Sequence, residues 1–537
     1  MVAPLDCTTT ARSDMTADQL RLASSARVAA TTAHGRVVGG RVRNGCQVFL
    51  NVPYGLDVAR WEDPRPLPPS YRYPTEHEYT VDGLYCAQPG RSYTAQIPIR
   101  DRLGQGAPTE NPFFADIYVP SGVDLSHPPR LPVRVFVHGG FLQFGSTSGQ
   151  HYNQQFFAAE ARHEVRVLLG HRLSALGFLA SASAGIPGNY GFKDVWLGLE
   201  WVQRHIASFG GDPAQVHLSG LSGGAHVVHQ LLHRAAALSP APAPFVTALL
   251  QSNGIVSDPL TPSERETQFA AFCAQLGADP ASPSILAELR DTARYPTAAL
   301  VAAVENMGLH STFRGVVEAG WLRADQMAFQ RSGGLGAALS AAGVRCVIAG
   351  DVRDEDAFYG IVHDVTTATD LLPNVARYYP LDVAQRLLAA YPPLDADAPR
   401  AQCQARLGRV LADGQVHLPV RLLCRDLAPA LPTVRYAVEM VPRALGTGGL
   451  VTHGSDTAIQ HLRLSVLSAD EEDAAVAWHD AVSGQVGAVM NGSFTQRPED
   501  EVLLLSKNGR VGWARDWRWD ELRAVEAAAL ADDNDDR

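Results

Sequence analysis

The chain has 537 residues, of which 46% are hydrophobic and 19% are charged, a composition typical of a folded protein with a large apolar core. Its formal net charge is −11, so it lacks the excess of Lys and Arg with which nucleic-acid-binding proteins displace counterions. It contains no run of about 18 apolar residues that would predict a membrane-spanning helix. We therefore expect neither a nucleic-acid partner nor a transmembrane segment.

The first part of the chain predicts a tail followed by hairpins. Residues 1–30 are rich in Ala, Thr, Ser and Asp and contain no continuous apolar stretch, so they predict an N-terminal tail and not a secretory signal. Residues 31–52 alternate turn glycines with short apolar runs, a pattern typical of antiparallel hairpins. Residues 59–74 are too rich in proline for regular structure and predict an ordered surface loop.

From residue 131 onward, short apolar strands alternate with helical patterns. Strands are expected at residues 131–140, 165–172, 214–224, 246–254, 344–355 and 431–441. Apolar residues at helical spacing occupy residues 194–210 and the segment that follows Gly224. Such alternation predicts a large, mostly parallel central sheet with helices on both faces. We expect a single α/β domain over residues 31–537, in which about residues 258–340 form a helical insertion.

The strongest functional motif is Gly220-Leu221-Ser222-Gly223-Gly224, a G-x-S-x-G sequence between an expected strand and an expected helix. A nucleophilic serine needs such a place, because a sharp turn exposes its hydroxyl at the sheet edge while glycines let neighbouring backbones pass closely. The N–H of the next residue, Gly223, then faces the oxyanion that forms during acyl transfer. The plainer interpretation is a glycine turn with a capping serine, but the strand before the motif favours a nucleophile.

A second motif, His138-Gly139-Gly140-Phe141, ends the expected strand at residues 131–140. Loops of this kind supply further N–H groups to an oxyanion hole in hydrolases with a nucleophile elbow. The alternative is a tight turn in which the glycines serve only geometry. Together with Ser222, the loop predicts an oxyanion hole made by the N–H groups of Gly140, Phe141 and Gly223.

These motifs belong to a longer pattern that resembles the type-B carboxylesterase/lipase family, which includes cholinesterases and fungal lipases. FLNVPYG (49–55) is similar to the family's F-x-G-I-P-Y-A, and RWEDP (60–64) is similar to its R-F-x-x-P. The block GNYGFKDVWLGLEWVQRHIASFGGDPAQVHLSGLSGG (188–224) matches the family sequence before the nucleophile almost position by position. The resemblance extends from about Gly35 to Gly454 and implies an α/β-hydrolase fold with a serine esterase site.

The same resemblance assigns the partners of Ser222. The residues alone leave several acids open after a buried strand, namely Asp351, Asp354, Glu355 and Asp356. GDVRDEDAF (350–358) resembles the family's G-x-x-x-D-E-G segment, which implies that Glu355 is the acid. GGLVTHGSD (448–456) resembles its histidine loop, which implies that His453 is the base. We expect His453, oriented by Glu355, to take the Ser222 proton as the hydroxyl attacks an ester carbonyl, without a metal or organic cofactor.

A rival pattern follows the serine. His226, His229 and His233 fall on one helical face, at spacings that can ligate zinc. No H-E-x-x-H glutamate accompanies them, and a partly buried polar stripe is the simpler interpretation. We therefore predict no metal site.

The sequence also departs from the family at positions around the serine. Leu221 and Gly223 replace the glutamate and alanine of the family's G-E-S-A-G. Phe141 stands where the family has glycine or alanine, so its ring must be accommodated near the acyl pocket. Asp356 replaces the glycine after the acid and adds a negative charge beside Glu355.

The cysteines and one missing tryptophan bear on location and substrate. The count of seven cysteines is odd and shows no CxxC spacing. The family's disulfides have no complete pair here, because Pro112 stands opposite Cys86, and Ala278 and Glu288 replace the second pair. We therefore expect a cytoplasmic protein. No tryptophan lies between Gln88 and Pro112, where cholinesterases carry their choline-binding residue, so a cholinesterase is not expected.

Three functions remain open from the sequence. The leading hypothesis is a carboxylesterase for a small or medium uncharged ester, lactone or aryl ester. The alternative enzyme is an acyl transferase, or a tailoring enzyme of secondary metabolism, that uses the same triad. A non-catalytic interaction homologue is less favoured, because Ser222, Glu355 and His453 are all present. The sequence leaves the oligomeric state open.

Overall fold

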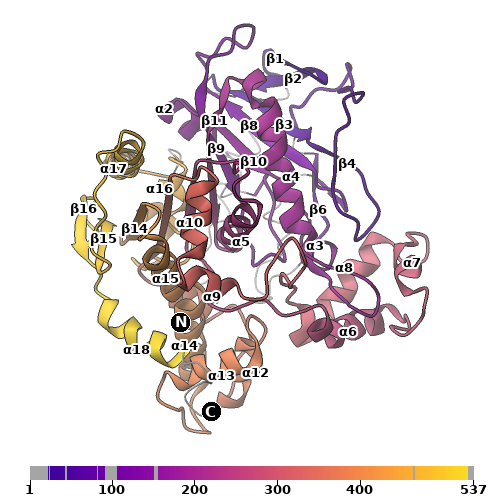
Figure 1. Ribbon diagram of the computed structural model, residues 1–537, viewed down its shortest axis with the longest axis vertical. Coiled ribbons are helices and arrows are strands. Elements are labelled where there is room, and N and C mark those ends of the chain that lie inside the picture. The colour runs from indigo at the N-terminus through magenta and orange to yellow at the C-terminus, as the bar shows by residue number, and fades with distance from the viewer. Residues whose placement is uncertain are drawn as a thin grey trace.

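The computed structural model describes residues 22, 24–42, 45–81, 83–90, 106–149, 155–463 and 466–529 (Figure 1). Most of the expected tail, residues 1–30, lies outside the described residues, as does the acidic end of the chain. The described part of that tail already contains a strand, because β1 begins at Arg27.

One large sheet crosses the molecule and joins twelve strands of the described chain. In spatial order these are β1 (Arg27–Thr32), β2 (Gly35–Arg41), β3 (Gln47–Pro53), β8 (Phe114–Val119), β10 (Val165–Leu169), β9 (Leu131–Val137), β11 (Gly211–Leu221), β12 (Thr247–Gln251), β13 (Cys346–Val352), β14 (Thr433–Val438), β15 (Glu501–Leu505) and β16 (Val511–Arg515). Every pairing from β10 to β15 is parallel, and the pairings outside that block are antiparallel. The sheet is thus parallel at its centre, where helical crossovers join the strands, and antiparallel at both margins.

The remaining described strands form two small sheets, and helices lie in the segments that connect the strands. Two short two-stranded sheets are formed by β4 (Gly55–Leu56) with β5 (Arg65–Pro66) and by β6 (Leu84–Cys86) with β7 (Ala107–Thr109). The helices are α2 (Gln155–Arg162), α3 (Ser174–Phe178), α4 (Tyr190–His205), α5 (Gly223–Leu238), α6 (Glu266–Leu276), α7 (Ile285–Arg290), α8 (Thr297–Glu305), α9 (Gln326–Arg331), α10 (Gly334–Ala341), α11 (Glu355–Tyr359), α12 (Leu371–Val375), α13 (Leu381–Ala389), α14 (Arg400–Ala412), α15 (Leu418–Leu427), α16 (Thr457–Gln460), α17 (Ala469–Met490) and α18 (Trp519–Ala529).

The central strands are buried on both faces, because successive side chains point to opposite sides of a sheet. Val135 and Val137 of β9 belong to a core that α4, α5 and α10 complete. Phe136, between them, packs into a different cluster with Phe156 of α2. The apolar runs of the sequence, which do not alternate with polar residues, are explained by these two helical layers.

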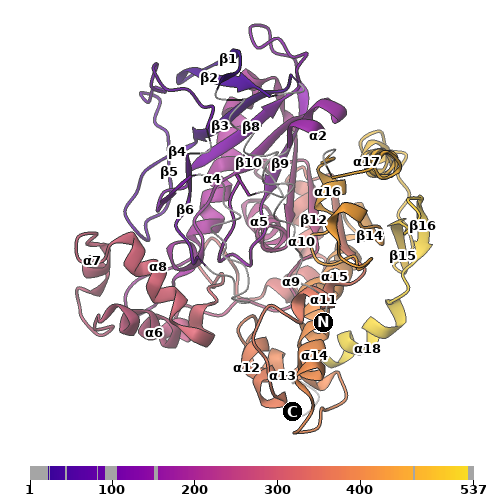
Figure 2. The same ribbon diagram turned by 180° about the vertical axis from the view of Figure 1, so that it is seen from behind.

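The helical segment between β12 and β13 holds α6 to α10, in the stretch where the sequence predicts an insertion. Phe269 and Phe272 of α6 reach the same core as β9 and α5, so the segment packs onto the domain. Figures 1 and 2 show α6, α7 and α8 as one group at the side of the molecule, apart from the group formed by α12 and α13.

A π-helical turn, Asp413–His417, joins α14 to α15. Pro419 explains it, because proline has no N–H to donate to the carbonyl of Gln415, four residues earlier. That carbonyl instead accepts the N–H of Gly254, at 3.1 Å. The π turn is thereby joined to the segment that follows β12. No helix in the described part of the chain combines the length and the apolar character that crossing a bilayer requires.

Candidate active site

Ser222 occupies a sharp turn between β11 and α5, as the motif predicts. Its backbone has φ 57° and ψ −123°, a conformation that residues other than glycine rarely adopt. Its N–H donates to the carbonyl of Gln251 at the end of β12, at 2.8 Å. The turn is therefore held by the neighbouring strand, and the residue that carries the hydroxyl is itself strained.

The flanking glycines are required by close backbone approach. A β carbon at Gly220 would overlap the backbone of Gly224, and one at Gly224 would overlap the carbonyl oxygen of Val137. Both positions therefore exclude any side chain. The close approach brings the end of β9, and the loop that follows it, against the turn of Ser222.

That loop contains three successive residues with positive φ: φ is 119° at Gly140, 57° at Phe141 and 69° at Leu142. A β carbon at Gly223 would lie 2.9 Å from the backbone nitrogens of both Phe141 and Leu142. The N–H groups of this loop and of the residue after Ser222 are thus gathered in one place. Gln143 holds the loop, because its Nε2 donates to the carbonyl of Phe141 at 2.8 Å.

Glu355 is the acid that the structure brings to His453. It is wholly buried, and its Oε2 lies 2.6 Å from Nδ1 of His453. The three other acids serve elsewhere. Asp351 pairs with His417 and Arg421, which lower its pKa against the effect of burial.

The remaining two acids lie around the histidine loop without touching the imidazole. Asp354 accepts the N–H of Val451 at 2.8 Å and so anchors the start of that loop. Asp356 is exposed, so the charge that replaces the family's glycine faces solvent and not Glu355.

The ring of His453 lies between aromatic side chains of α11. Phe358 stacks on it with ring centroids 4.9 Å apart, and Tyr359 contacts it edge-on at 5.1 Å. Its Nε2 is buried and has no hydrogen-bond partner among the described residues. Neither aromatic was predicted from the sequence. A signal existed, because both lie three and four positions after Glu355, which places them on its side of a helix.

Side-chain contacts connect the three segments that carry the predicted site residues. The ring of Phe141 stacks with Phe358 at 6.0 Å, which links the oxyanion loop to the neighbour of His453. A β carbon at Gly454 would lie 3.6 Å from Cδ2 of Leu221, which links the histidine loop to the serine turn. Leu221 therefore packs where the family has a glutamate, and Phe141 belongs to an aromatic cluster.

A second buried carboxyl lies close to this pair. Asp456 is wholly enclosed, and burial raises its pKa to about 6, to which the charge of Glu355 also contributes. Its Oδ2 accepts a hydrogen bond from Gln460 at 3.2 Å.

Two of the three histidines after the serine contact polar protein groups, whereas both ring nitrogens of His233 lack a hydrogen-bond partner in the described chain. His226 lies 3.4 Å from Arg314, and His229 contacts Gln330 at 2.9 Å. The ring of His233 stacks on His229. Within the part of the chain that the structure describes, no three His, Cys, Asp or Glu residues are placed to hold a metal ion. The cysteines of that part, including Cys86, are buried free thiols.

With this geometry in place, comparison with known proteins identifies the family. The model of the carboxylesterase family matches residues 25–444. This chain belongs to the carboxylesterase family. The protein is accordingly a carboxylic ester hydrolase, as the sequence predicts.

Individual relatives of this carboxylesterase agree with that placement. An uncharacterized esterase/lipase of Schizosaccharomyces pombe is 27% identical over 502 residues, which cover 88% of this chain and 90% of that protein. Acetylcholinesterase of Electrophorus electricus is 34% identical over 243 residues, or 42% of this chain and 36% of that one. The solved structure of a PNB esterase superposes with a TM-score of 0.71 at 20% identity, covering 93% of this chain and 99% of that one. This likeness confirms the α/β-hydrolase fold.

Proposed function

We propose that Ser222, His453 and Glu355 form the catalytic triad of this esterase and that the reaction passes through an acyl-enzyme on Ser222. The contact of 2.6 Å between His453 Nδ1 and Glu355 carries the proposal. It keeps the proton on Nδ1, so that Nε2 is the basic nitrogen. That nitrogen is buried and makes no hydrogen bond within the described chain, while a strained serine turn packs against the same loop.

The chemistry follows from these roles. As Oγ of Ser222 bonds to the ester carbonyl carbon, its proton passes to Nε2 of His453, and Glu355 stabilises the imidazolium. The N–H groups of Gly140, Phe141 and Gly223 hold the carbonyl oxygen while it carries negative charge, each donor contributing about 3 kcal/mol.

Collapse of this intermediate breaks the bond to the alcohol, which leaves with the proton from Nε2. Water then adds to the acyl carbon and gives a proton to Nε2, and that proton returns to Oγ of Ser222 as the acid is released. Every step uses groups of this chain and water.

Labelling by a fluorophosphonate probe, followed by peptide mass spectrometry, tests the proposal. We expect a single adduct on Ser222. Ser222→Ala should remove it and lower kcat/KM for p-nitrophenyl butyrate by a factor on the order of 10⁵. Ser332→Ala, at an exposed serine, is the matched control and should change neither result. An adduct on another residue, or undiminished hydrolysis by Ser222→Ala, would contradict the proposal.

A further inference from the structure

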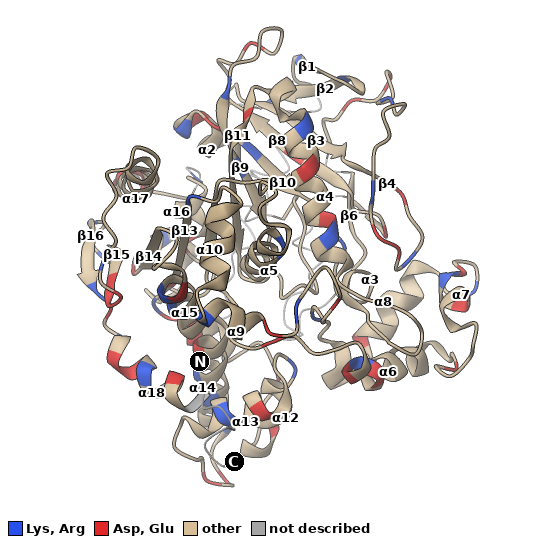
Figure 3. Cartoon of the chain, in the orientation of Figure 1, with Lys and Arg blue, Asp and Glu red and all other residues tan. Residues whose placement is uncertain are grey.

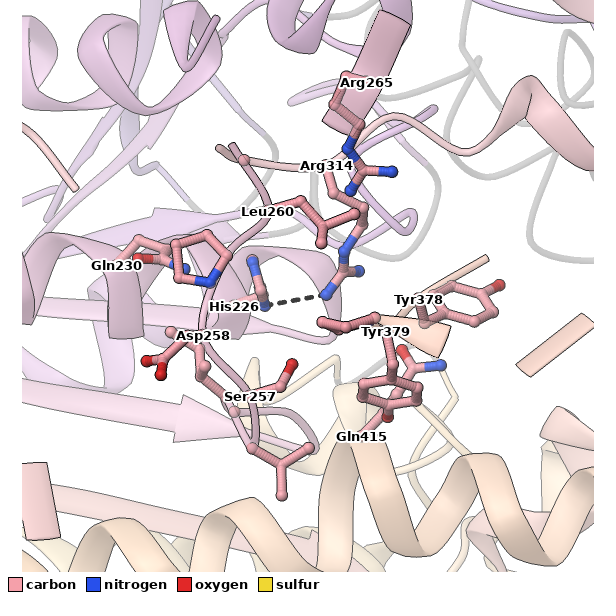
Figure 4. Close-up of a pocket in the computed structure, with 16 residues that line it drawn as sticks. His226, Gln230, Ser257, Asp258, Leu260, Arg265, Arg314, Tyr378, Tyr379 and Gln415 are labelled. Carbon is pink, nitrogen blue, oxygen red and sulfur yellow. Dashed lines mark hydrogen bonds between the residues drawn. The ribbon is translucent and has the colours of Figure 1, made fainter. Parts of the chain in front are cut away.

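A pocket with about 500 Å³ of space, its open mouth included, lies one helical turn beyond Ser222. Figure 4 shows the residues that line it, and the argument below uses His226, Arg265, Arg314, Tyr378, Tyr379 and Gln415. Of these residues, the sequence singled out only His226, as a possible zinc ligand that was not favoured.

The pocket lies next to the serine turn. His226 lies four residues after Ser222 on α5, and its N–H donates to the Ser222 carbonyl at 3.0 Å. Residues 254–260, which line the pocket, continue from the end of β12 that holds the turn. The ring of Tyr378 lies 6.0 Å from that of Phe141 in the oxyanion loop. A group in the pocket therefore lies within reach of a short chain bound at Ser222.

Two guanidinium groups meet in this pocket, as Figure 4 shows. Arg314 lies 3.4 Å from His226 and above the ring of Tyr378. The side chain of Arg265 makes no hydrogen bond or ion pair with the described residues, although its Nε is buried. Burial, and then the adjacent charge of Arg314, lower the pKa of Arg265 to about 10.

Many arginines elsewhere on the molecule pair with acids. Figure 3 shows both signs of charge interspersed along the outer helices, and Arg204, for example, pairs with Glu200 at 3.0 Å. Arg265 differs because a second cation stands beside it, while the neighbouring Glu264, whose charge acts in the opposite direction, forms no ion pair with it among the described residues. Two neighbouring cations repel each other, so their arrangement is stabilised when an anion binds between them.

The two described acids near the pocket, Asp258 and Glu264, bond to groups other than the guanidinium groups. Asp258 accepts the N–H of Met327 at 2.8 Å, and its carboxylate points away from the two guanidinium groups (Figure 4). Glu264 accepts hydrogen bonds from Thr261. Burial lowers the pKa of His226 well below its ordinary value, so its imidazole is neutral. The imidazole therefore adds no charge to the pocket, whose cationic side chains are Arg265 and Arg314.

Two further polar side chains that line the pocket have no hydrogen-bond partner in the described chain. The amide of Gln415 is 3% exposed, and neither its oxygen nor its nitrogen has a hydrogen-bond partner in the described chain. The hydroxyl of Tyr379 is likewise buried without a partner among those residues. Buried polar groups cost free energy unless they are hydrogen-bonded, so these donors point to a ligand. The π turn before Pro419 is what places Gln415 there.

We propose that this pocket binds a carboxylate at the far end of the acyl group, so that the enzyme prefers monoesters of short dicarboxylic acids. Arg265 and Arg314 would hold the carboxylate, since arginine matches its planar geometry. The inference rests on the proposed function and replaces the uncharged ester expected from the sequence.

The residues around the pocket indicate whether it faces the acyl part or the alcohol part of the ester. The alcohol must leave beside Nε2 of His453, which gives it a proton. No residue of α11 or of the histidine loop, 447–456, lines the pocket. The pocket thus lies away from the path of the alcohol, while Tyr378 in its wall contacts Phe141, on the side where the carbonyl oxygen is held.

Three esters of matched shape separate the possibilities. Monoethyl glutarate carries a carboxylate on the acyl group, and ethyl 5-oxohexanoate carries a neutral methyl ketone in the same place. In 3-(butyryloxy)propanoate the carboxylate is on the alcohol. We expect kcat/KM for monoethyl glutarate to exceed that for each of the others by roughly tenfold to a hundredfold.

Arg265→Gln tests the residue itself. Because Arg265 has no ion pair within the described chain to lose, the variant should fold. The preference for monoethyl glutarate over ethyl 5-oxohexanoate should fall by roughly tenfold or more. Arg204→Gln, at a surface arginine paired with Glu200, is the matched control and should keep the preference.

The outcomes are distinguishable from failure of the proposed function. If neutral esters are hydrolysed through Ser222 but monoethyl glutarate is not preferred, the triad stands and the carboxylate site is wrong. An equal preference for 3-(butyryloxy)propanoate would overturn the acyl assignment. Calorimetry on Ser222→Ala requires no turnover: tighter binding of monoethyl glutarate than of ethyl 5-oxohexanoate, lost with Arg265→Gln, supports the site, and equal binding overturns it.

Discussion

The two sides of Ser222 differ in how their polar groups are satisfied. On the side of His453, Glu355 binds the imidazole at Nδ1 and Asp354 anchors the loop, although Nε2 of His453 and Oδ1 of Asp456 have no hydrogen-bond partner in the described chain. On the side of His226, Arg265 and Gln415 have no such partners within the described chain. Groups that must keep one geometry are held by the protein itself. Groups that recognise a ligand are left unpaired, and their cost is recovered when the ligand binds.

A single substitution on the side of His453 should lower activity more than one on the side of His226. Glu355→Gln should lower kcat/KM for p-nitrophenyl butyrate by a factor on the order of 10³ to 10⁴, because the amide no longer stabilises the imidazolium. Asp354→Asn should lower it by less than about tenfold, since the amide oxygen can still accept the N–H of Val451. Steady-state rates of nitrophenol release measure both. Equal losses would mean that anchoring the loop, and not the charge of Glu355, is what matters.

The oxyanion loop offers a test of fit between two departures from the family. A β carbon at Gly223 would press on the nitrogens of Phe141 and Leu142, so Gly223→Ala should lower kcat by roughly 10- to 100-fold. Adding Phe141→Gly should restore part of the loss, because glycine accepts φ 57° freely and can move. The values of kcat for the original protein, the two single variants and the double variant form a double-mutant cycle. A double variant no better than the product of the singles would exclude this coupling.

Asp456, on the side of His453, makes the free energy of unfolding depend on pH, and its raised pKa determines the sign. With its pKa raised to about 6, the folded protein keeps a proton that the unfolded chain loses from about pH 4, so this residue's contribution to stability falls as pH rises between those values. Asp456→Asn should raise the free energy of unfolding by about 1–3 kcal/mol near pH 8, with no such gain well below pH 4. Urea unfolding at both pH values measures it. Asp356→Asn, at an exposed carboxylate, should show no such difference, and a gain of equal size there would refute the assignment.

The smallest effect compares two glutamines. Gln415→Met removes unpaired buried polar atoms, so it should raise the free energy of unfolding by about 1 kcal/mol while weakening the preference for monoethyl glutarate. The side chain of Gln88 accepts the N–H of Gly145 at 2.7 Å and donates to its carbonyl at 2.8 Å. Gln88→Met removes both hydrogen bonds and should lower the free energy of unfolding by about 1–3 kcal/mol. Thermal unfolding of both variants decides. Destabilisation by Gln415→Met would show that its amide is satisfied in the free protein.

Much of the fold could be predicted, because its signals are local. The buried strands at residues 131–140 and 214–224 are continuous apolar runs that end in glycines, and β9 and β11 occupy them. The strands β8, β15 and β16 were not predicted. β8 and β16 lie outside the central parallel block, β15 is its last strand, and each of the three pairs antiparallel with at least one neighbour at a margin of the sheet.

By itself, the sequence determined the serine turn and the oxyanion loop, because both depend on glycines that a few neighbouring residues require. It also placed Glu355 and His453 through the family resemblance. Only the tertiary structure decided which acid touches the imidazole, since Asp354, Glu355 and Asp356 are adjacent in the chain but face different ways. It alone brought Arg265 and Arg314 together with Gln415, because no local pattern relates side chains that meet only after the chain has folded.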